Sequence, residues 1–243
     1  MKFKSPLVSW LGAMLFLAGV LIGLSLTAVV TWSESEARIY TSYNGEASLK
    51  VKCPLMLSPA ETAIISADIL NLTDGDIKPV VSAEISRPRT PRTTSQAVSL
   101  TPGESTTIQW TVDVSDVIFD RLILASVLQS RYRDNPSHSG SCGIVLFSLF
   151  GMTGLQTFAL VFAISFLAML SGGALWIYTR WPLNKFSKNL AQINAVLLGT
   201  TILALLSALP RWWGATLFFD ALILLVMGVI ITEFAFSSQK YRD

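Results

Sequence analysis

Asp220 is the residue whose position most suggests chemistry. It lies in the apolar run WWGATLFFDALILLVMGVIITEFAF, residues 212–236. A carboxylate inside a hydrocarbon span is costly, so it usually faces a polar partner or marks a functional site. Three interpretations stay open: a pair with Arg211 or a polar neighbour such as Asn194, a contact with another subunit, or a proton relay. The first is favoured, because a lone acidic residue seldom makes a relay.

The two cysteines of the chain, Cys53 and Cys142, form a second candidate pair. Both lie in the polar middle of the chain, which we place outside the cytoplasm below, where disulfides persist. A bond between positions 89 residues apart would stabilise the fold by about 4–5 kcal/mol in the loop-entropy model. We therefore expect a disulfide; two free buried thiols are the alternative.

No other residues combine into a catalytic or metal-binding set. His138 is the one histidine, and it lies in the Pro/Gly/Ser-rich stretch DNPSHSGS, where solvated polar residues are ordinary. One histidine with two distant cysteines does not make a usual zinc site. We assign no catalytic, cofactor-binding or metal residue, expect no cofactor, and predict that the protein is not an enzyme.

Five arginines are candidate contacts for a partner or for lipid. They lie in two predicted loops: Arg87, Arg89 and Arg92 in SRPRTPRTTS, and Arg131 and Arg133 further along. Loop arginines can meet acidic partners or lipid phosphates, although most such runs are simply solvated. The net charge of +2 gives no case for nucleic acid.

Four apolar runs must hold these residues in place. The chain is 51% hydrophobic and only 14% charged, whereas soluble domains carry about 25% charged residues. About 20 apolar residues cross the hydrocarbon core of a bilayer. We predict spans at 5–33, 155–179, 189–210 and 212–236. The first is too long for a signal-peptide core, which favours a retained anchor over a cleaved signal.

The basic residues predict the orientation of these spans. Seven Lys and Arg fall in the predicted cytoplasmic pieces, and only Arg211 falls in the short outer loop PRWWG. Both termini should therefore be cytoplasmic and residues 33–150 outside, in an integral protein of the bacterial plasma membrane. The seven are Lys2, Lys4, Arg180, Lys185, Lys188, Lys240 and Arg242.

Small residues recur at helical spacing in three of the predicted spans. Such residues let helix backbones approach closely, although glycine is also simply frequent in membrane helices. The candidate packing faces are Gly12, Gly19 and Gly23 in the first span, Ala168 and Gly172 in the second, and Ala191, Ala195 and Gly199 in the third.

The middle of the chain has the alternating pattern of β-strands. In VSLTPGESTTIQWTVD, the side chains of Ile108, Trp110, Val112 and Val114 share one face, which we predict to be the core face. Short strands with turn signals every 8–12 residues indicate a sandwich. The candidate strands are 47–53, 61–71, 78–87, 94–101, 105–114, 121–131 and 141–149.

Two stretches of this region, LSPAETAIISADILNLTDGDI (57–77) and LTPGESTTIQWTV (100–112), resemble bacterial immunoglobulin-like repeats of the CARDB or NEW3 type. The shared features are L-x-P-G-E before a strand and an N-x-x-D turn. The resemblance covers only the outer domain. It implies an immunoglobulin-like fold acting as a spacer or binding module, and it carries over no catalytic residues.

We thus predict four transmembrane α-helices with an extracytoplasmic immunoglobulin-like β-sandwich inserted between the first and second. The expected domains are an anchor (1–32), the sandwich (33–150) and a three-helix region (151–243). The favoured function is a non-catalytic accessory or scaffold subunit that contacts lipid and binds a membrane complex or an extracytoplasmic protein. The alternative is a small proton- or solute-coupled transporter component that uses Asp220.

Overall fold

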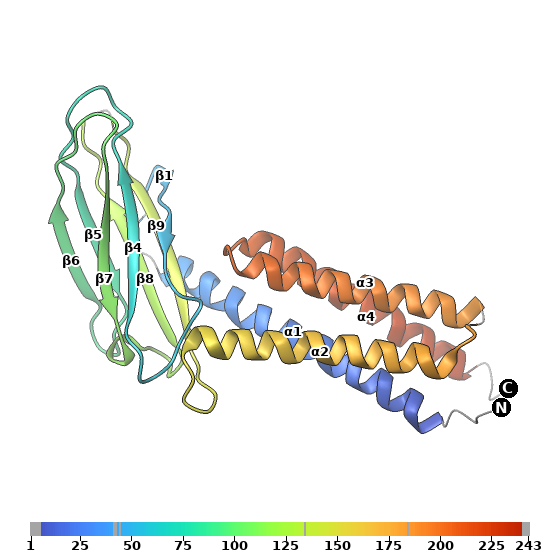
Figure 1. The fold of residues 1–243 in the computed structure, drawn as a ribbon. Helices are drawn as coiled ribbons and strands as arrows, with labels where there is room; N and C mark the ends of the chain where they lie inside the picture. Colours follow the sequence, from blue (N-terminus) through green and yellow to red (C-terminus); the bar gives the residue numbers. More distant parts are fainter. Residues whose placement is uncertain (1–5, 41–42, 44, 134, 184, 240–243) are drawn as a thin grey trace. The chain divides into compact units, whose positions relative to one another are not determined.

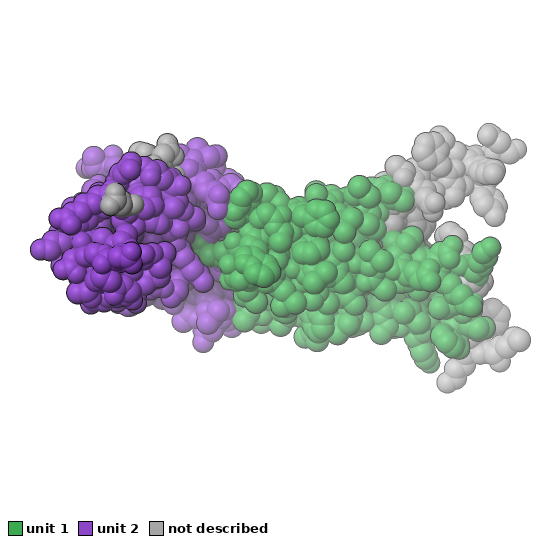
Figure 2. Space-filling view, turned by 90° about the horizontal axis from the view of Figure 1, so that it is seen from above, with its two compact units in different colours: residues 1–31, 159–243 green, residues 32–158 purple. Residues whose placement is uncertain are grey.

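The computed structural model describes residues 6–40, 43, 45–133, 135–183 and 185–239 (Figure 1). The chain divides into two compact units, one of residues 1–31 and 159–243 and one of residues 32–158 (Figure 2). The first is helical and the second is built mainly of strands. Lys2, Lys4, Lys240 and Arg242, which enter the predicted orientation, lie outside the described residues.

The helices follow the apolar runs of the sequence. They are α1 (Pro6–Tyr40), α2 (Gly154–Arg180), α3 (Lys185–Ala208) and α4 (Trp213–Gln239). Three stretches, Leu7–Tyr40, Gly154–Arg180 and Ser187–Ala208, are long and apolar enough to cross a membrane, and α4 adds the shorter apolar stretch Trp213–Val229. These helices suit the chain to membrane association.

Helix α1 continues beyond its apolar run into the polar residues 33–40. The added turns contain Glu34, Glu36, Ala37 and Arg38, which are good helix formers, and no glycine or proline interrupts them. This polar end of α1 belongs to the second unit, where Ser33 and Ala37 are fully buried.

In the helical unit, the glycine face of α1 lies directly against α2 and α3. A Cβ added to Gly19 would lie 2.8 Å from the backbone nitrogen of Met169, and one added to Gly23 would lie 2.8 Å from a methyl group of Thr201. The Ser165 hydroxyl donates to the Gly19 carbonyl at 2.8 Å. Backbones this close gain dispersion energy and interhelical hydrogen bonds, the main sources of helix association in lipid.

One apolar cluster of the helical unit draws on all four helices. Its buried members are four residues apart on α1 and seven apart on α3, as expected for one face of a helix. They are Phe16, Val20, Met169, Leu197, Ala204 and Ile223.

The second unit is a sandwich of two sheets. The larger sheet has the order β1-β9-β8-β5-β6, with β3 also paired to β9, and the smaller has the order β2-β4-β7. A 3₁₀ turn, Val114–Asp116, follows β7. The strands are β1 (Ala47–Ser48), β2 (Val51–Lys52), β3 (Met56–Leu57), β4 (Ala63–Leu70), β5 (Val80–Ile85), β6 (Arg92–Ala97), β7 (Ser105–Val112), β8 (Leu122–Gln129) and β9 (His138–Leu146).

The predicted core face of β7 is present, with one exception. Ile108, Trp110 and Val112 are buried between the sheets. Val114 is 50% exposed, because β7 ends at Val112 and the chain turns into the 3₁₀ segment. The inward residues of β4, β5, β8 and β9 complete the core.

Three strand predictions differ from the structure. The predicted strand 47–53 is two short pieces, β1 and β2, that join different sheets. β6 begins at residue 92 rather than 94 and ends at 97, since Arg92 pairs with Ile85 of β5. β9 begins at His138, which the sequence placed in a loop, because β1 pairs with this part of the strand in parallel.

The end of α1 and the start of α2 both lie close to β9 or to β3, the short strand paired with β9. A Cβ on Gly143 would collide with the carbonyl of Ser33, so the end of α1 packs directly on this strand. A Cβ on Gly154, the first residue of α2, would likewise collide with the carbonyl of Met56 in β3. Cys53 and Cys142 of β9 form a disulfide with a Cα–Cα distance of 6.7 Å.

Candidate functional site

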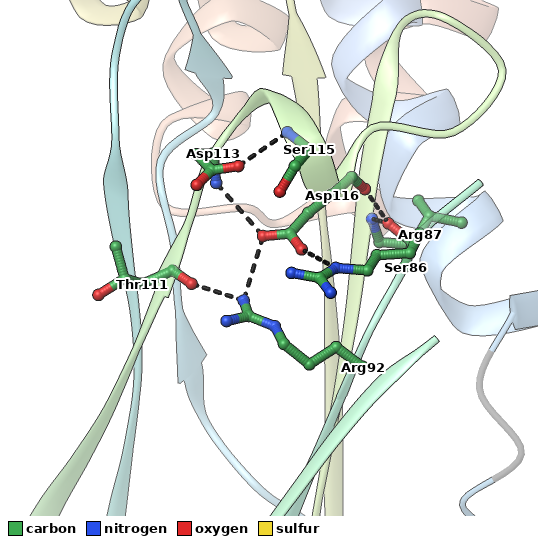
Figure 3. Close-up of polar contacts among 8 residues, drawn as sticks. Ser86, Arg87, Arg92, Thr111, Asp113, Ser115 and Asp116 are labelled. Carbon is green, nitrogen blue, oxygen red and sulfur yellow. Dashed lines mark hydrogen bonds and ion pairs between the residues drawn. The ribbon is translucent and has the colours of Figure 1, made fainter. Parts of the chain in front are cut away.

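A polar cluster of the sandwich is centred on the carboxylate of Asp116 (Figure 3). Its side chain is 2% exposed and accepts from Arg87 Nε at 3.1 Å and from Arg92 Nη2 at 3.1 Å. The backbone N–H of Asp113 also donates to it, at 3.3 Å. Two cations and a backbone donor thus compensate one buried anion, which is the condition for burying a carboxylate at acceptable cost.

Serine 86 links this cluster to the middle of the larger sheet. Its hydroxyl donates to the Asp116 carbonyl at 2.7 Å and accepts from the backbone N–H of Leu124 at 2.9 Å. Because Leu124 lies in β8 and Ser86 follows β5, the loop after β7 is tied to two neighbouring strands (Figure 3).

Arg92 joins the two sheets at their edges. It begins β6, the last strand of the larger sheet, and its Nη2 donates to the Thr111 carbonyl of β7 at 2.6 Å (Figure 3). The same nitrogen contacts Asp116, so one guanidinium bridges an edge strand of each sheet and the buried anion. Arg87 and Arg92 therefore have partners within the chain, although their side chains stay 43% and 33% exposed.

The other three arginines are more exposed. Arg89 lies on the surface of the loop between β5 and β6. Arg131 pairs with Glu46 at 3.3 Å, with both side chains more than half exposed, a geometry that contributes at most about 1 kcal/mol. The guanidinium of Arg133 lies 5.4 Å from the ring centre of Tyr132.

The turn residues that carry the CARDB-type resemblance meet at the opposite end of the strands. The N–H of Asn71 donates to the Glu104 carbonyl at 2.9 Å, and the N–H of Gly103 donates to the Asn71 carbonyl at 3.0 Å. Gly103 has φ +74°, a conformation that favours glycine. The shared residues therefore form two turns that are hydrogen-bonded to each other.

Asn71 also opens the sequence Asn71-Leu72-Thr73, which fits a glycosylation sequon. Its side chain is buried, and Nδ2 donates to the carbonyls of Gly75 and Leu100 at 2.9 and 3.1 Å. The nitrogen that would carry a glycan is thus occupied by the fold.

Exposed carboxylates on the sandwich have lowered pKa values. The pKa of Asp68 lies below its ordinary range because Lys52 and Thr107 hydrogen-bond to it, and the pKa of Asp113 is lowered by hydrogen bonds from Ser115. The pKa of Glu104 is lowered by the backbone and hydroxyl of Thr101. These groups favour the charged form in the folded state.

In the helical unit, Asp220 is 7% exposed and accepts one hydrogen bond from the described residues. The donor is the Thr27 hydroxyl of α1, at 2.8 Å, rather than Arg211 or Asn194. The same hydroxyl lies 3.2 and 3.0 Å from the carbonyls of Gly23 and Leu24. A single hydroxyl proton is shared among three acceptors, so this carboxylate is compensated far less than Asp116.

The predicted packing face of α3 is wrong. Ala195 is exposed, and a Cβ on Gly199 would meet nothing within 4 Å. The buried side of α3 instead carries Leu197, Thr201 and Ala204. A step of two residues turns a helix by about 200°, which places Ala195 and Gly199 roughly opposite Leu197 and Thr201.

On α2, by contrast, Gly172 lies in contact with α1. A Cβ on Gly172 would lie 2.7 Å from the Gly12 carbonyl, and a Cβ on Gly12 would lie 2.9 Å from the backbone nitrogen of Trp176. Ala168 is only half-buried beside this face, as is Ala191 in α3.

Metal-ligating side chains do not gather within the described part of the chain. No group of three or more His, Cys, Asp or Glu side chains there could hold a metal ion. His138 lies in β9 opposite Gln129 of β8. Arg87 and Arg92 compensate the Asp116 carboxylate, although Arg92 Nε is buried without a hydrogen-bond partner among the described residues. The cluster ties the loop after β7 to the larger sheet.

Two of these features were absent from the sequence analysis. Asp116 was not predicted, although D-V-S-D, residues 113–116, has the spacing of a capping box. In this box the Asp113 side chain accepts from the N–H of Ser115, and the Asp116 side chain accepts from the N–H of Asp113. Thr27 gave no signal, because a threonine in a membrane helix usually bonds to its own backbone.

Comparisons with known proteins give limited likenesses. No family model and no curated protein matches the chain. Among solved structures, a CARDB domain from Pyrococcus furiosus, in complex with di-metal ions, is 15% identical over 44% of this chain and all of that domain, with a TM-score of 0.33.

Two larger enzymes also contain a similar part. A cycloisomaltooligosaccharide glucanotransferase from Paenibacillus sp. is 20% identical over 44% of this chain and 15% of its own, with a TM-score of 0.35. A β-glucuronidase from Bacteroides uniformis is 16% identical over 41% and 13%, with a TM-score of 0.32. This chain therefore matches only a small fraction of either enzyme. The likeness to a CARDB domain, like the resemblance noted in the sequence, covers only part of this chain.

Proposed function

We propose that this protein is a non-catalytic membrane accessory subunit whose β-sandwich lies outside the cytoplasm and binds a partner protein. The helices of the first unit would cross the bilayer, with both termini on the cytoplasmic side together with the α2–α3 connection, which is flanked by Arg180 and Lys185. Cys53 and Cys142 support an outer location for the sandwich, since disulfides persist in oxidising compartments.

The observation that carries the proposal is the open edge strand β6. It ends the larger sheet, and its residues Thr93–Ala97 are all exposed. Edge strands are normally protected by lysines, prolines or bulges, because their free backbone groups recruit further strands. Residues 93–97 read TTSQA and carry no charge or proline. Such a strand suits an extended segment of a partner that adds to the sheet.

A photo-crosslinker on β6 tests this proposal in native membranes. Ser95→benzoylphenylalanine should form an adduct with one defined protein. The control, Asp74→benzoylphenylalanine in the exposed loop after β4, should not. Gln96→Lys should abolish the adduct by placing a charge on the edge, whereas Gln109→Lys on the outward side of β7 should leave it. A chain that forms no β6 adduct and purifies alone contradicts the proposal.

A second candidate function is a proton- or solute-coupled transporter component. It is favoured by the sparse compensation of Asp220, which has Thr27 as its described donor. Asp220→Asn in reconstituted vesicles would then abolish flux while leaving the protein folded. Unchanged flux, or none in the parent protein, removes this candidate.

A further inference from the structure

The segment 147–153, between β9 and α2, presents aromatic side chains outward without any charge; we name it the aromatic foot. Phe147 is 44% exposed and Phe150 is 91% exposed, and Leu155 in the first turn of α2 is 73% exposed. No Asp, Glu, Lys or Arg occurs from residue 147 to residue 157. Exposed apolar patches mark sites of interaction with proteins or membranes, so this composition suits an apolar surrounding.

Hydrogen bonds hold the aromatic foot in a defined conformation. Thr153 and Gln156 form a capping box for α2: the N–H of Thr153 donates to Gln156 Oε1 at 3.1 Å and the N–H of Gln156 donates to Thr153 Oγ1 at 3.3 Å. The N–H of Gly154 donates to the Glu61 carboxylate at 2.9 Å, a favourable charge at a helix N-terminus.

Further hydrogen bonds close the loop on itself. Ser148 Oγ donates to the Met152 carbonyl at 2.9 Å, and the N–H of Met152 donates to the Leu149 carbonyl at 2.9 Å. At its tip, Phe150 has φ 52° and Gly151 has φ 74°. Left-handed backbone is strained for a bulky side chain, so the fold maintains an unfavourable conformation that points an aromatic ring outward.

The position of the foot along the chain identifies what surrounds it. α2 has 27 residues and is therefore about 40 Å long, against about 30 Å for the hydrocarbon core. Its first turns lie at the bilayer surface if the helix crosses the membrane. The N–H of Leu149 donates to Thr157 Oγ1 at 3.4 Å, which holds the residue next to Phe150 beside the second turn of α2.

We propose that the aromatic foot inserts Phe150 into the boundary between headgroups and acyl chains of the bilayer. This inference rests on the proposed function, because it requires α2 to cross the membrane. Aromatic and aliphatic side chains gain free energy at that boundary, and an uncharged loop loses little by leaving water. The foot would then fix the depth of the start of α2 in the bilayer.

Lipid crosslinking of the full chain in phospholipid nanodiscs tests the inference. Phe150→benzoylphenylalanine, an aromatic replacement, should give a phospholipid adduct by mass spectrometry. Leu72→benzoylphenylalanine, an equally exposed position in the loop after β4, should give none. Ile164→benzoylphenylalanine on the exposed side of α2 reports whether that helix contacts lipid at all.

The outcomes separate the two proposals. Lipid adducts at both 150 and 164, with none at 72, support the foot. Adducts at 164 alone, or protein adducts only at 150, overturn the foot and leave the membrane-crossing helix intact. Absence of lipid adducts at 164 means that α2 does not cross the bilayer, and both proposals then fail.

Discussion

The two units of this protein bury a carboxylate in contrasting ways. In the sandwich, Asp116 has two arginines and a backbone donor. In the helical unit, the described donor to Asp220 is one threonine hydroxyl. The arginines of the sandwich reach the buried anion with side chains that stay 43% and 33% exposed. In the helical unit, the carboxylate instead meets a short neutral donor, and the helix backbones pack closely nearby.

The largest effect should come from removing the covalent link of the sandwich. Replacing both Cys53 and Cys142 with alanine opens a loop with a sequence separation of 89. The sandwich should lose about 4–5 kcal/mol in the loop-entropy model. Denaturant-dependent proteolysis would measure this, and hydrogen exchange in α3 should stay unchanged. Equal destabilisation of α3 would show that the units do not unfold independently.

Asp116→Ala should have the next largest effect. It leaves two guanidinium groups without their anion, and because both are partly exposed we expect a loss of about 3 kcal/mol, at the low end for broken buried pairs. The same proteolysis assay would measure it. Asp74→Ala, at an exposed loop position, should change little. An effect no larger than that of the control would mean that the cluster is not structural.

Close packing of the helices can be tested with a matched pair of glycines. Gly19→Leu forces atoms into the backbone of α2 and should cost about 1–3 kcal/mol. Gly199→Ala has open space around it and should be neutral or stabilise α3 by up to about 1 kcal/mol. Thermal unfolding in detergent would compare them. Similar losses in both variants would contradict the described helix interface.

Thr27→Val should have a smaller effect. It removes the hydroxyl donor to Asp220 while keeping the side-chain shape, and interhelical hydrogen bonds of this type contribute about 0.6 kcal/mol on average. Thermal unfolding is again the measurement. Thr200→Val is the control, because the Thr200 hydroxyl donates to carbonyls of its own helix, those of Val196 and Leu197 in α3. A loss of several kcal/mol at Thr27 would place Asp220 among fully structural carboxylates like Asp116.

The smallest effect should be a dependence of sandwich stability on acid. Asp68, Asp113 and Glu104 have folded pKa values below their ordinary values of 3.8, 3.8 and 4.5. Their contribution is therefore complete above these ordinary values and is lost as the pH falls through the lower, folded pKa values. Denaturant titrations between pH 6 and about pH 2 would reveal a shallow decline, small because all three groups are solvated. Asp68→Asn should reduce its slope.

The sequence predicted the parts of the fold that depend on period and length. Alternation placed Ile108, Trp110 and Val112 in the core, and the length of the apolar runs located the helices. The sequence did not predict features that depend on contacts with residues distant in the chain. His138 became a strand residue because β1 pairs with it, and Gly199 turned away from the bundle because other residues of α3 fill the core.

The polar clusters were harder to predict for the same reason. The arginines of residues 87–92 were recognised as a group. Their sequence does not show whether the carboxylate that they bind belongs to a partner protein or to this chain. Asp116 lies 24 residues beyond Arg92, and Ser86 ties its loop to the strands beside these arginines. The pairing of Asp220 with Thr27 spans 193 residues and depends entirely on how α1 and α4 pack.

The position of β9 in the sequence sets when the early strands of the sandwich can pair during synthesis. Ala47 and Met56 pair with His138 and Val145, so β1 and β3 have no strand to join until the last strand has left the ribosome. In the orientation proposed above, α1 enters the bilayer before β9 is made. The early strands then stay unpaired until β9 follows, and unpaired strand edges are prone to aggregation.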